Sequence, residues 1–267
     1  MIKNRFIVVI FLVVSVLCQT CSVVPITGRR QIILLPESEM ISMGLTSYQE
    51  FLKENPPSTD VKNAEIVKKV GNDLVSAVQR YFAENNMQDR LEGYQWEFNL
   101  VDNNEANAWC MPGGKVVVYK GILPYTIDEN GLAVVISHEI AHAVARHGNE
   151  RMSQQLLTQL GGIALSEALK QKPQETQNIF LSVYGLGSQV GLILPYSRKH
   201  EFEADRLGLI FMAMAGYDPK TAVTFWERMA SAGGAKPPEF LSTHPSDEKR
   251  ISSIKSVLPE AEKYYKK

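Results

Sequence analysis

The five residues His138-Glu139-Ile140-Ala141-His142 form an H-E-x-x-H sequence inside an apolar stretch that we expect to be helical. On an α-helix, residues four apart lie on one face, about 6 Å apart along the axis. His138 and His142 can therefore both reach one tetrahedral zinc ion. Glu139 then points toward a water molecule beside the metal and can take its proton. The stretch predicts a metal centre built on a helix.

The flanking sequence predicts that this helix is buried. Residues 132–136 and 143–145 are apolar, and residues 128–130 supply acidic and capping side chains at its start. Residues 146–148 supply a basic last turn and a glycine, which we expect to end the helix. Because burying histidine and glutamate is costly without partners, a chance match in an ordinary core helix is the less favoured interpretation.

A four-coordinate catalytic zinc site needs a third protein ligand. His147 follows His142 by five residues and points away from the zinc face, so we expect it to pack or cap near the helix end. The better candidate is Glu201, which lies with Asp205 on one face of a second predicted helix. Glu201 can ligate zinc, and Asp205 can accept a hydrogen bond from a ligand histidine and fix its tautomer. The structural alternative is a solvated, charged helix start.

Two segments, H-E-I-A-H-A-V-A-R-H at 138–147 and S-R-K-H-E-F-E-A-D-R-L-G at 197–208, resemble the M48 zinc metallopeptidases, a gluzincin family. Three more segments resemble its bacterial lipoprotein protease branch. They are C-S-V-V-P-I-T-G-R-R-Q at 21–31, N-A-W-C-M-P-G-G at 107–114 and L-S-T-H-P at 241–245. The chain ends soon after the last segment, so we expect the branch without a tetratricopeptide domain.

The resemblance implies a fold and a set of roles. The fold is α+β and mainly helical, a zincin-type metalloprotease domain with a small β-sheet and an H-E-x-x-H active-site helix. One zinc ion per chain is expected, with His138, His142 and Glu201 as its ligands. Glu139 is then the general base, and Asp205 orients a ligand histidine.

The segment at 107–114 predicts a substrate-binding strand. Its last four residues are a turn signal, and residues 96–101 and 115–119 on either side are strand-like and form a hairpin-like pair. An extended peptide can bind such an edge through backbone hydrogen bonds. With the resemblance, this favours a substrate strand over an ordinary structural hairpin. Its residues are Asn107, Ala108, Trp109 and Cys110.

His244 belongs to the L-S-T-H-P segment, and the preceding glycines and prolines at 233–238 predict a mobile loop. A histidine on such a loop is usually exposed. The resemblance implies instead that His244 lies near the active site. It is then either a stabiliser of the oxyanion or a latch on the open zinc position.

The N-terminus predicts membrane attachment. Lys3 and Arg5 precede an apolar stretch at 6–17, which is shorter than the roughly 20 residues that span a bilayer and is typical of a bacterial export signal. Cys21 begins the segment that resembles the family's lipidated start, so it is the expected lipid-attachment site. The alternatives are attachment at Cys18, cleavage by ordinary signal peptidase, and retention of the segment as an anchor.

These patterns predict the organisation of the chain. Residues 1–20 are a lipoprotein-type signal peptide, 21–260 the metallopeptidase domain and 261–267 a C-terminal tail. The expected location is the bacterial cell envelope, on a membrane facing the periplasm. Further helices are expected at about 36–53, 60–83, 149–170, 175–190, 197–215 and 218–230.

Composition limits the other classes of function. The chain has 267 residues and a formal charge of −1, which becomes −3 without residues 1–20. It has no basic stripe, so no nucleic-acid partner is expected. With Cys18 removed and Cys21 lipidated, Cys110 would be the one remaining thiol of the three cysteines, which excludes a disulfide framework.

The predicted function is a zinc-dependent endopeptidase that hydrolyses misfolded or surplus envelope proteins. One alternative is a chaperone or scaffold lipoprotein for envelope assembly with a latent metal site. Another is a zinc hydrolase that does not act on proteins. The intact Glu139 argues against a dead enzyme.

Overall fold

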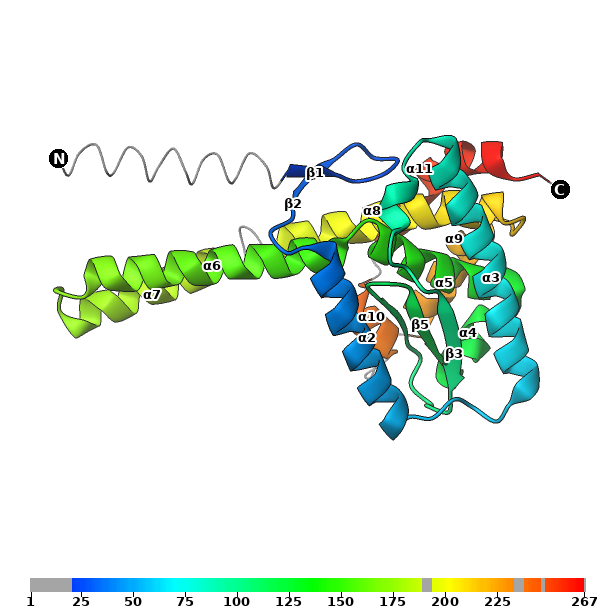
Figure 1. The fold of residues 1–267 in the computed structure, drawn as a ribbon, viewed down its shortest axis with the longest axis horizontal. Coiled ribbons are helices and arrows are strands. Elements are labelled where there is room, and N and C mark those ends of the chain that lie inside the picture. The colour runs from blue at the N-terminus through cyan, green and yellow to red at the C-terminus, as the bar shows by residue number, and fades with distance from the viewer. Residues whose placement is uncertain (1–20, 189–193, 233–237, 246–247, 267) are drawn as a thin grey trace. The chain divides into compact units, whose positions relative to one another are not determined.

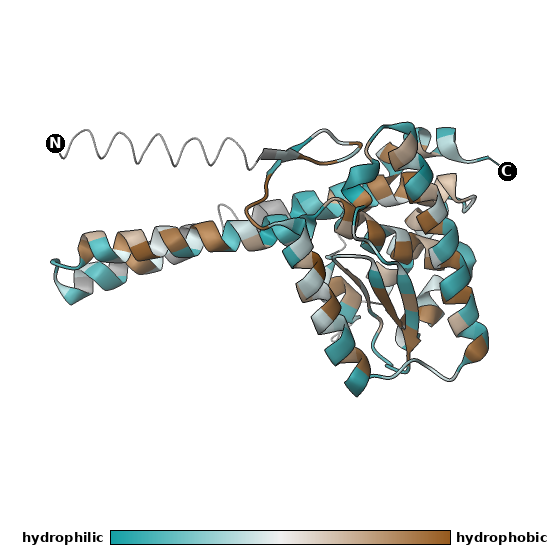
Figure 2. Ribbon diagram, viewed as in Figure 1, coloured by the Kyte–Doolittle hydropathy of each residue, from teal (hydrophilic) through white to brown (hydrophobic). Residues whose placement is uncertain are grey.

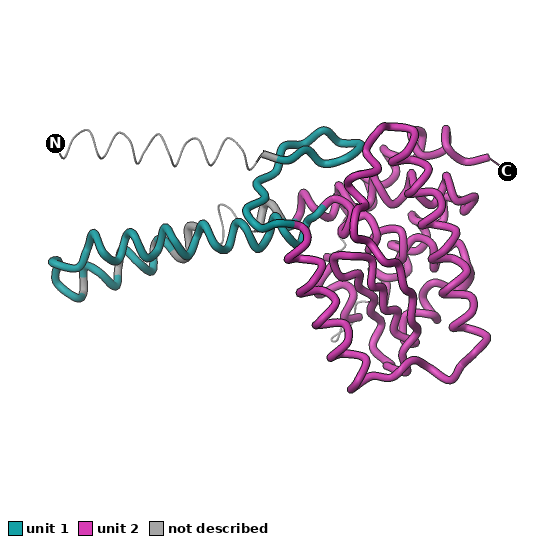
Figure 3. Tube along the Cα trace, in the orientation of Figure 1, with its two compact units in different colours: residues 1–36, 146–197 teal, residues 37–145, 198–267 magenta. Residues whose placement is uncertain are grey.

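The computed structural model describes residues 21–188, 194–232, 238–245 and 248–266. The chain divides into two compact units, coloured separately in Figure 3: unit 1 is residues 1–36 and 146–197, and unit 2 is residues 37–145 and 198–267. The predicted signal segment at 1–20 lies outside the described residues, and the boundaries at 20 and 260 stay predictions.

Unit 1 contains a short β-hairpin and two long helices. Strand β1 (Cys21–Val23) pairs antiparallel with β2 (Arg30–Ile32), and helix α6 (His147–Leu169) packs against α7 (Gln174–Ser188). The Arg29 guanidinium donates to both carboxylate oxygens of Glu150, at 2.8 and 2.7 Å. The segment that begins at Cys21 is thereby held on α6. Among the helices that the structure describes, none is long and apolar enough to cross a membrane.

Unit 2 is built around a three-stranded sheet. Its strand order is β3 (Glu97–Val101), β5 (Lys115–Tyr119), β4 (Ala108–Met111), with β3 parallel and β4 antiparallel to β5. The three valines of β5 are fully buried, as suits a central strand of β-branched residues. Figure 2 shows hydrophobic residues along this strand. Strand β4 is an edge of the sheet.

The two faces of the sheet pack against different helices (Figure 1). Helix α2 (Glu37–Glu54) covers one face, where Tyr48 joins residues of β3 and β5 in a buried cluster. Helices α3 (Val61–Glu84) and α5 (Glu129–Val144) cover the other face. Because side chains alternate along a strand, Ala108 and Cys110 of β4 lie on the α5 face. Trp109 lies on the α2 face, edge-on to Phe51 with ring centroids 5.0 Å apart.

The other helices complete unit 2. They are α4 (Leu123–Thr126), α8 (Leu194–Met214, within this unit from Arg198), α9 (Thr221–Ser231), α10 (Glu239–Thr243), α11 (Glu248–Ala261) and 3-10 turns at Gln88–Leu91, Lys120–Ile122 and Glu262–Tyr264. The predicted mainly helical α+β class is confirmed. Gly216 has φ +89° and ends α8 where the sequence predicted. Helix α9 begins at Thr221, later than the predicted 218, because Asp218 accepts the Lys220 N–H and caps a preceding turn.

Helix α5 is buried along most of its length, as predicted. Its N-cap is Asp128, whose side chain accepts the Gly131 N–H at 2.9 Å. The predicted glycine stop is wrong. The chain turns at Arg146, which has φ +60° in the left-handed region, and Gly148 lies inside α6. A non-glycine residue therefore adopts the conformation that usually favours glycine.

The predicted hairpin-like pairing of residues 96–101 with 115–119 is also wrong. These segments are parallel neighbours, with Glu97 opposite Lys115. The hairpin is formed by β4 and β5, through a turn in which Gly113 and Gly114 have φ +90° and +88°. Local closure through this glycine turn decides which strands form the hairpin.

Candidate metal centre

Helices α5 and α8 bring the three predicted metal ligands together. His138 and His142 lie on successive turns of α5, and Glu201 lies on α8. Glu201 Oε2 is 3.3 Å from His138 Nε2, and Glu201 Oε1 is 3.4 Å from His142 Nε2. The two histidine Nε2 atoms are 3.0 Å apart. Three potential ligand atoms from two distant segments thus converge on one point.

These separations fit a tetrahedral zinc site. With Zn–N and Zn–O bonds of about 2.0–2.2 Å, neighbouring ligand atoms of a tetrahedron lie roughly 3.3–3.6 Å apart. The observed 3.3 and 3.4 Å agree, and 3.0 Å is slightly short. Two imidazoles and a carboxylate are also a donor set that suits zinc. The residues present therefore fit this ion.

Asp205 fixes the orientation of His138, one turn after Glu201 on α8. Its Oδ1 lies 3.0 Å from His138 Nδ1, on the far side of the ring from Nε2. A proton on Nδ1 leaves the Nε2 lone pair free for a metal. Burial would raise the pKa of Asp205, but Arg250 and His138 outweigh this effect and hold the pKa below its ordinary value. Asp205 is therefore an ionised acceptor.

Glu139 lies beside this cluster and is buried at 4% exposure. Burial raises the pKa of its carboxyl above the ordinary value, although His244 and His138 act in the opposite direction. Its Oε1 is 3.3 Å from His244 Nε2. Within the described residues, no group forms a hydrogen bond of acceptable geometry with this oxygen. A carboxylate with a raised pKa and an oxygen that makes no hydrogen bond is suited to accept a proton.

His244 joins the same cluster and is buried, not exposed. It follows α10, and its Nδ1 lies 3.0 Å from Glu201 Oε2 and 3.1 Å from His138 Nε2. Its potential ligand atom lies within 4.8 Å of those of His138, His142 and Glu201. Both predicted roles, latch and oxyanion stabiliser, require this proximity.

Arg250 is part of the site and was missed from the sequence. This side chain on α11 is 1% exposed and binds Asp205 with two hydrogen bonds, Nε to Oδ2 at 2.7 Å and Nη2 to Oδ1 at 2.8 Å. Its Nη1 also lies 3.1 Å from Glu201 Oε2. In the sequence it follows Asp247, Glu248 and Lys249, a pattern typical of an exposed helix start. No local signal separates it from these neighbours.

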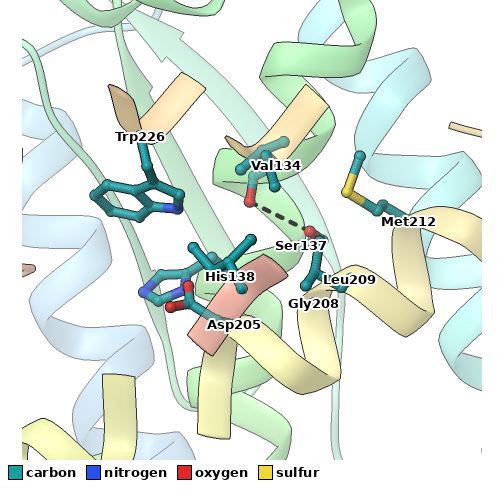
Figure 4. Close-up of a pocket in the computed structure, with 10 residues that line it drawn as sticks. Val134, Ser137, His138, Asp205, Gly208, Leu209, Met212 and Trp226 are labelled. Atoms are coloured by element: carbon teal, nitrogen blue, oxygen red, sulfur yellow. Dashed lines mark hydrogen bonds and ion pairs between the residues drawn. The ribbon is translucent and has the colours of Figure 1, made fainter. Parts of the chain in front are cut away.

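Aromatic side chains enclose His138. Trp226 of α9 and Phe240 of α10 lie edge-on to its ring, with centroids 6.0 and 6.4 Å away. Figure 4 shows the Asp205 carboxylate beside the His138 ring, with Trp226 above both. A cavity of 10 Å³, which is about the size of one water, lies next to these groups, and Ser137 donates to Val134 in its wall. The imidazole thus has little room to rotate.

The predicted substrate strand packs against helix α5, which carries two of the predicted ligands. Ala108, Trp109 and Cys110 belong to edge strand β4, and Asn107 precedes it and accepts the Tyr119 N–H through its carbonyl at 3.0 Å. Burial raises the pKa of the Cys110 thiol well above its ordinary value, and Glu139 adds to this effect. His147, by contrast, is completely buried at the start of α6. It is not part of the four-residue group of potential ligands, which consists of His138, His142, Glu201 and His244.

The chain matches known proteins along most of its length. Residues 68–258 match the model of peptidase family M48. The mitochondrial metalloendopeptidase OMA1 of Schizosaccharomyces pombe is 41% identical over 69% of this chain and 52% of its own length. The Saccharomyces cerevisiae protein of that name is 30% identical over 90% and 70%. The beta-barrel assembly-enhancing protease of Escherichia coli is 31% identical over 60% and 34%. The chain spans about half the length of the first relative.

The predicted location in a bacterial cell envelope is wrong. The relatives matched in Schizosaccharomyces pombe, Saccharomyces cerevisiae and Homo sapiens are all named as mitochondrial proteins. Two basic residues before a short apolar stretch predict a membrane-directed start, but they do not identify the membrane.

The site and the comparisons agree on the chemistry. Two histidines and a glutamate on two helices form a group that fits zinc, the metal that M48 metallopeptidases use. The two yeast relatives are named as metalloendopeptidases, and the family model covers both helices of the site. The chain therefore belongs to peptidase family M48.

Proposed function

We propose that this chain is a zinc metalloendopeptidase that removes misfolded or surplus proteins at a membrane, and that His138, His142 and Glu201 hold its zinc ion. The observation that carries the assignment of the site is the meeting of these three side chains beside Glu139, on a helix that packs against edge strand β4. The chaperone or scaffold alternative has no comparable support, because an intact base and ligand set would serve no purpose in it.

The protein groups have separate roles in the proposed reaction. Bound zinc supplies a Lewis acid that polarises a peptide carbonyl and acidifies a water molecule. Glu139 accepts the proton of that water and returns it to the leaving amine, for which a raised pKa is suitable. Asp205 holds His138 in the tautomer that binds metal.

The substrate backbone is proposed to extend β4. Asn107 accepts the Tyr119 N–H, and Met111 accepts the Gly114 N–H. In an antiparallel pair, every second residue directs its backbone N–H and C=O groups away from the partner strand. The backbone groups of Ala108 and Cys110 therefore face the open edge of the sheet. A peptide strand paired there would lie along the face that holds Glu139. Pairing through the backbone accepts many sequences, which suits removal of diverse misfolded chains.

Membrane attachment through the N-terminal segment, with a lipid on Cys21, stays part of the proposal, as does membership of the lipoprotein branch. Support comes from the apolar stretch at 6–17 and from the name of the Escherichia coli relative, which refers to β-barrel assembly. The mass of the mature protein shows whether a lipid is attached to Cys21. The Cys21→Ser variant should be released from membranes.

Zinc content and casein cleavage test the central proposal. The purified protein should bind one zinc ion, lose activity with a chelator and regain it with zinc. Glu139→Gln should keep zinc and lose proteolysis, whereas His138→Ala should lose both. Full casein cleavage by metal-free protein would exclude the proposed site. Proteins that accumulate with Glu139→Gln but not with wild type would identify the substrates.

A further inference from the structure

We propose that Arg250 is a positioning residue of the metal centre, which sets the geometry of His138 and Glu201 and connects them to the segment carrying His244. This inference rests on the proposed zinc site. Arg250 contacts Asp205, Glu201 and the backbone of Pro245, and its Nη2 also lies 3.4 Å from both ring nitrogens of His138.

The bond to Asp205 fixes the plane of that carboxylate. Arg250 uses Nε and Nη2 against the two different oxygens, at 2.7 and 2.8 Å, which is the paired geometry that guanidinium groups favour. One of those oxygens, Oδ1, is also the atom 3.0 Å from His138 Nδ1. A carboxylate held at both oxygens cannot rotate away from the imidazole. The orientation of His138 therefore depends on Arg250 through Asp205, in addition to the direct approach of Nη2 to the ring.

The remaining guanidinium nitrogen joins a zinc ligand to the His244 segment. Nη1 lies 3.1 Å from Glu201 Oε2 and donates to the Pro245 carbonyl at 3.2 Å. Pro245 directly follows His244, whose Nδ1 approaches the same Glu201 oxygen at 3.0 Å. Arg250 thus binds both the predicted ligand Glu201 and the backbone next to His244.

Burial and charge explain why an arginine is needed here. Glu139, Glu201 and Asp205 are all buried within the same site, and carboxylates in such a place require compensating charge. Arg250 supplies one positive charge at 1% exposure, and its guanidinium carbon lies 3.6 Å from the centre of the Trp226 ring. Trp226 in turn stacks on Phe240, at 5.6 Å and 20°. The cation is thus held between a carboxylate and an aromatic face. Lysine cannot reproduce this geometry.

The chain offers a matched control on the same two helices. Arg206 of α8 binds Glu260 of α11 through Nε at 2.9 Å and Nη2 at 2.8 Å. This pair has the same chemistry and also joins α8 to α11, but it is about one-third exposed and contacts no member of the metal cluster in these bonds. The Arg206 variant therefore measures the effect on zinc affinity of breaking an arginine–glutamate pair between α8 and α11 that is not part of the metal centre.

The test measures zinc affinity by chelator competition for wild type, Arg250→Met, Arg250→Lys and Arg206→Met. Removing a group that orients a zinc ligand typically lowers affinity by about 10–100-fold, so Arg250→Met should fall in that range. Arg206→Met should stay near wild type. Arg250→Lys should recover part of the loss, because it restores charge but not the paired hydrogen bonds. In the cobalt-substituted proteins, the visible spectrum should change for Arg250→Met and not for Arg206→Met.

Failure of the inference is distinguishable from failure of the zinc site. Absence of stoichiometric zinc in wild type would contradict the proposed function. Wild-type zinc binding with equal or tighter binding by Arg250→Met would overturn the role of Arg250 alone. If Arg250→Met does not fold, Arg250→Lys and Asp205→Asn decide. In the double variant, the loss of zinc-binding free energy should be smaller than the sum of the two single losses, because both changes disturb the contact between Arg250 and Asp205. Additive losses would overturn the inference.

Discussion

Nδ1 of His138 lies 3.0 Å from Oδ1 of Asp205, while Nε2 of the same ring faces His142 and Glu201. The two nitrogens of one imidazole are thus divided between an orienting carboxylate and a metal-binding cluster. The pairing determines the tautomer, because a proton shared with Asp205 cannot also occupy Nε2. An exposed histidine would have no such preference.

Asp205→Asn should lower zinc affinity by about 10–100-fold, because the amide keeps the size of the side chain but loses the charge that holds the Nδ1 proton. Chelator competition measures the change. Glu203→Gln, two residues earlier on α8, is the control, since it also neutralises a buried carboxylate of this helix. Equal zinc affinity in Asp205→Asn and wild type would contradict the orienting role.

The stability of the metal-free protein should depend on the protonation of His138. Burial alone would lower its pKa, but Asp205 and Glu201 outweigh this and raise the pKa to about 9 from an ordinary 6.5. Because the folded pKa is the higher one, charged His138 stabilises the fold fully below pH 6.5. This contribution is lost as the pH rises toward 9, and it is on the order of 3 kcal/mol at most.

Urea unfolding of chelator-treated protein between pH 6 and 10 measures this dependence. The free energy of unfolding should fall across the window in wild type and fall less in Asp205→Asn, which lacks one partner of the imidazolium. A free energy that is flat or rises across this window would contradict the prediction.

His244→Ala should raise proteolytic activity. Nδ1 of His244 lies 3.0 Å from Glu201, and Nε2 lies 3.3 Å from Glu139, so the ring contacts both a ligand and the base. This arrangement favours the latch over the oxyanion stabiliser. If the latch contributes about 1.4 kcal/mol, its loss would raise the rate about tenfold. Casein cleavage by the variant measures the effect, with His200→Ala as a control for loss of a buried histidine on α8. A fall in activity would favour the oxyanion role.

The sequence predicted the parts of the site that depend on helical spacing. His138 with His142, and Glu201 with Asp205, are each four residues apart, so a single helix places both members on one face. The meeting of the two helices followed from chemistry, since a zinc ion needs a third ligand. Both predictions agree with the geometry of the cluster.

Other features depend on contacts that no local pattern encodes. Arg250 is buried only because Asp205, Trp226 and Glu201 surround it from other helices, and in the sequence it is one charge in a charged stretch. The parallel pairing of β3 with β5 was missed for a similar reason. Strand-like composition predicts that a segment is extended, but it does not determine its neighbour or direction.

Cys110→Pro should impair cleavage without loss of zinc. The Cys110 N–H lies on the open side of β4 in the ladder, so proline removes a donor available to a substrate and leaves the bonds to β5 in place. We expect kcat/KM for a peptide to fall about tenfold, the value of one lost hydrogen bond. Cys110→Ala is the matched control, since it removes the thiol and keeps the N–H. Similar kcat/KM values for the two variants, with normal zinc content, would argue against strand addition at this edge.

Gly71→Ala and Gly148→Ala should change stability in opposite directions, although both replace a glycine within a helix. A Cβ at Gly71 of α3 would overlap the Phe98 ring of β3, so the helix and the sheet would have to separate. Such overpacking typically costs about 1–3 kcal/mol. A Cβ at Gly148 of α6 meets no atom within 4 Å, so alanine there should stabilise the helix by up to about 1 kcal/mol. Urea unfolding of both variants measures the difference. A stable Gly71→Ala protein would mean that α3 does not pack against β3 at this distance.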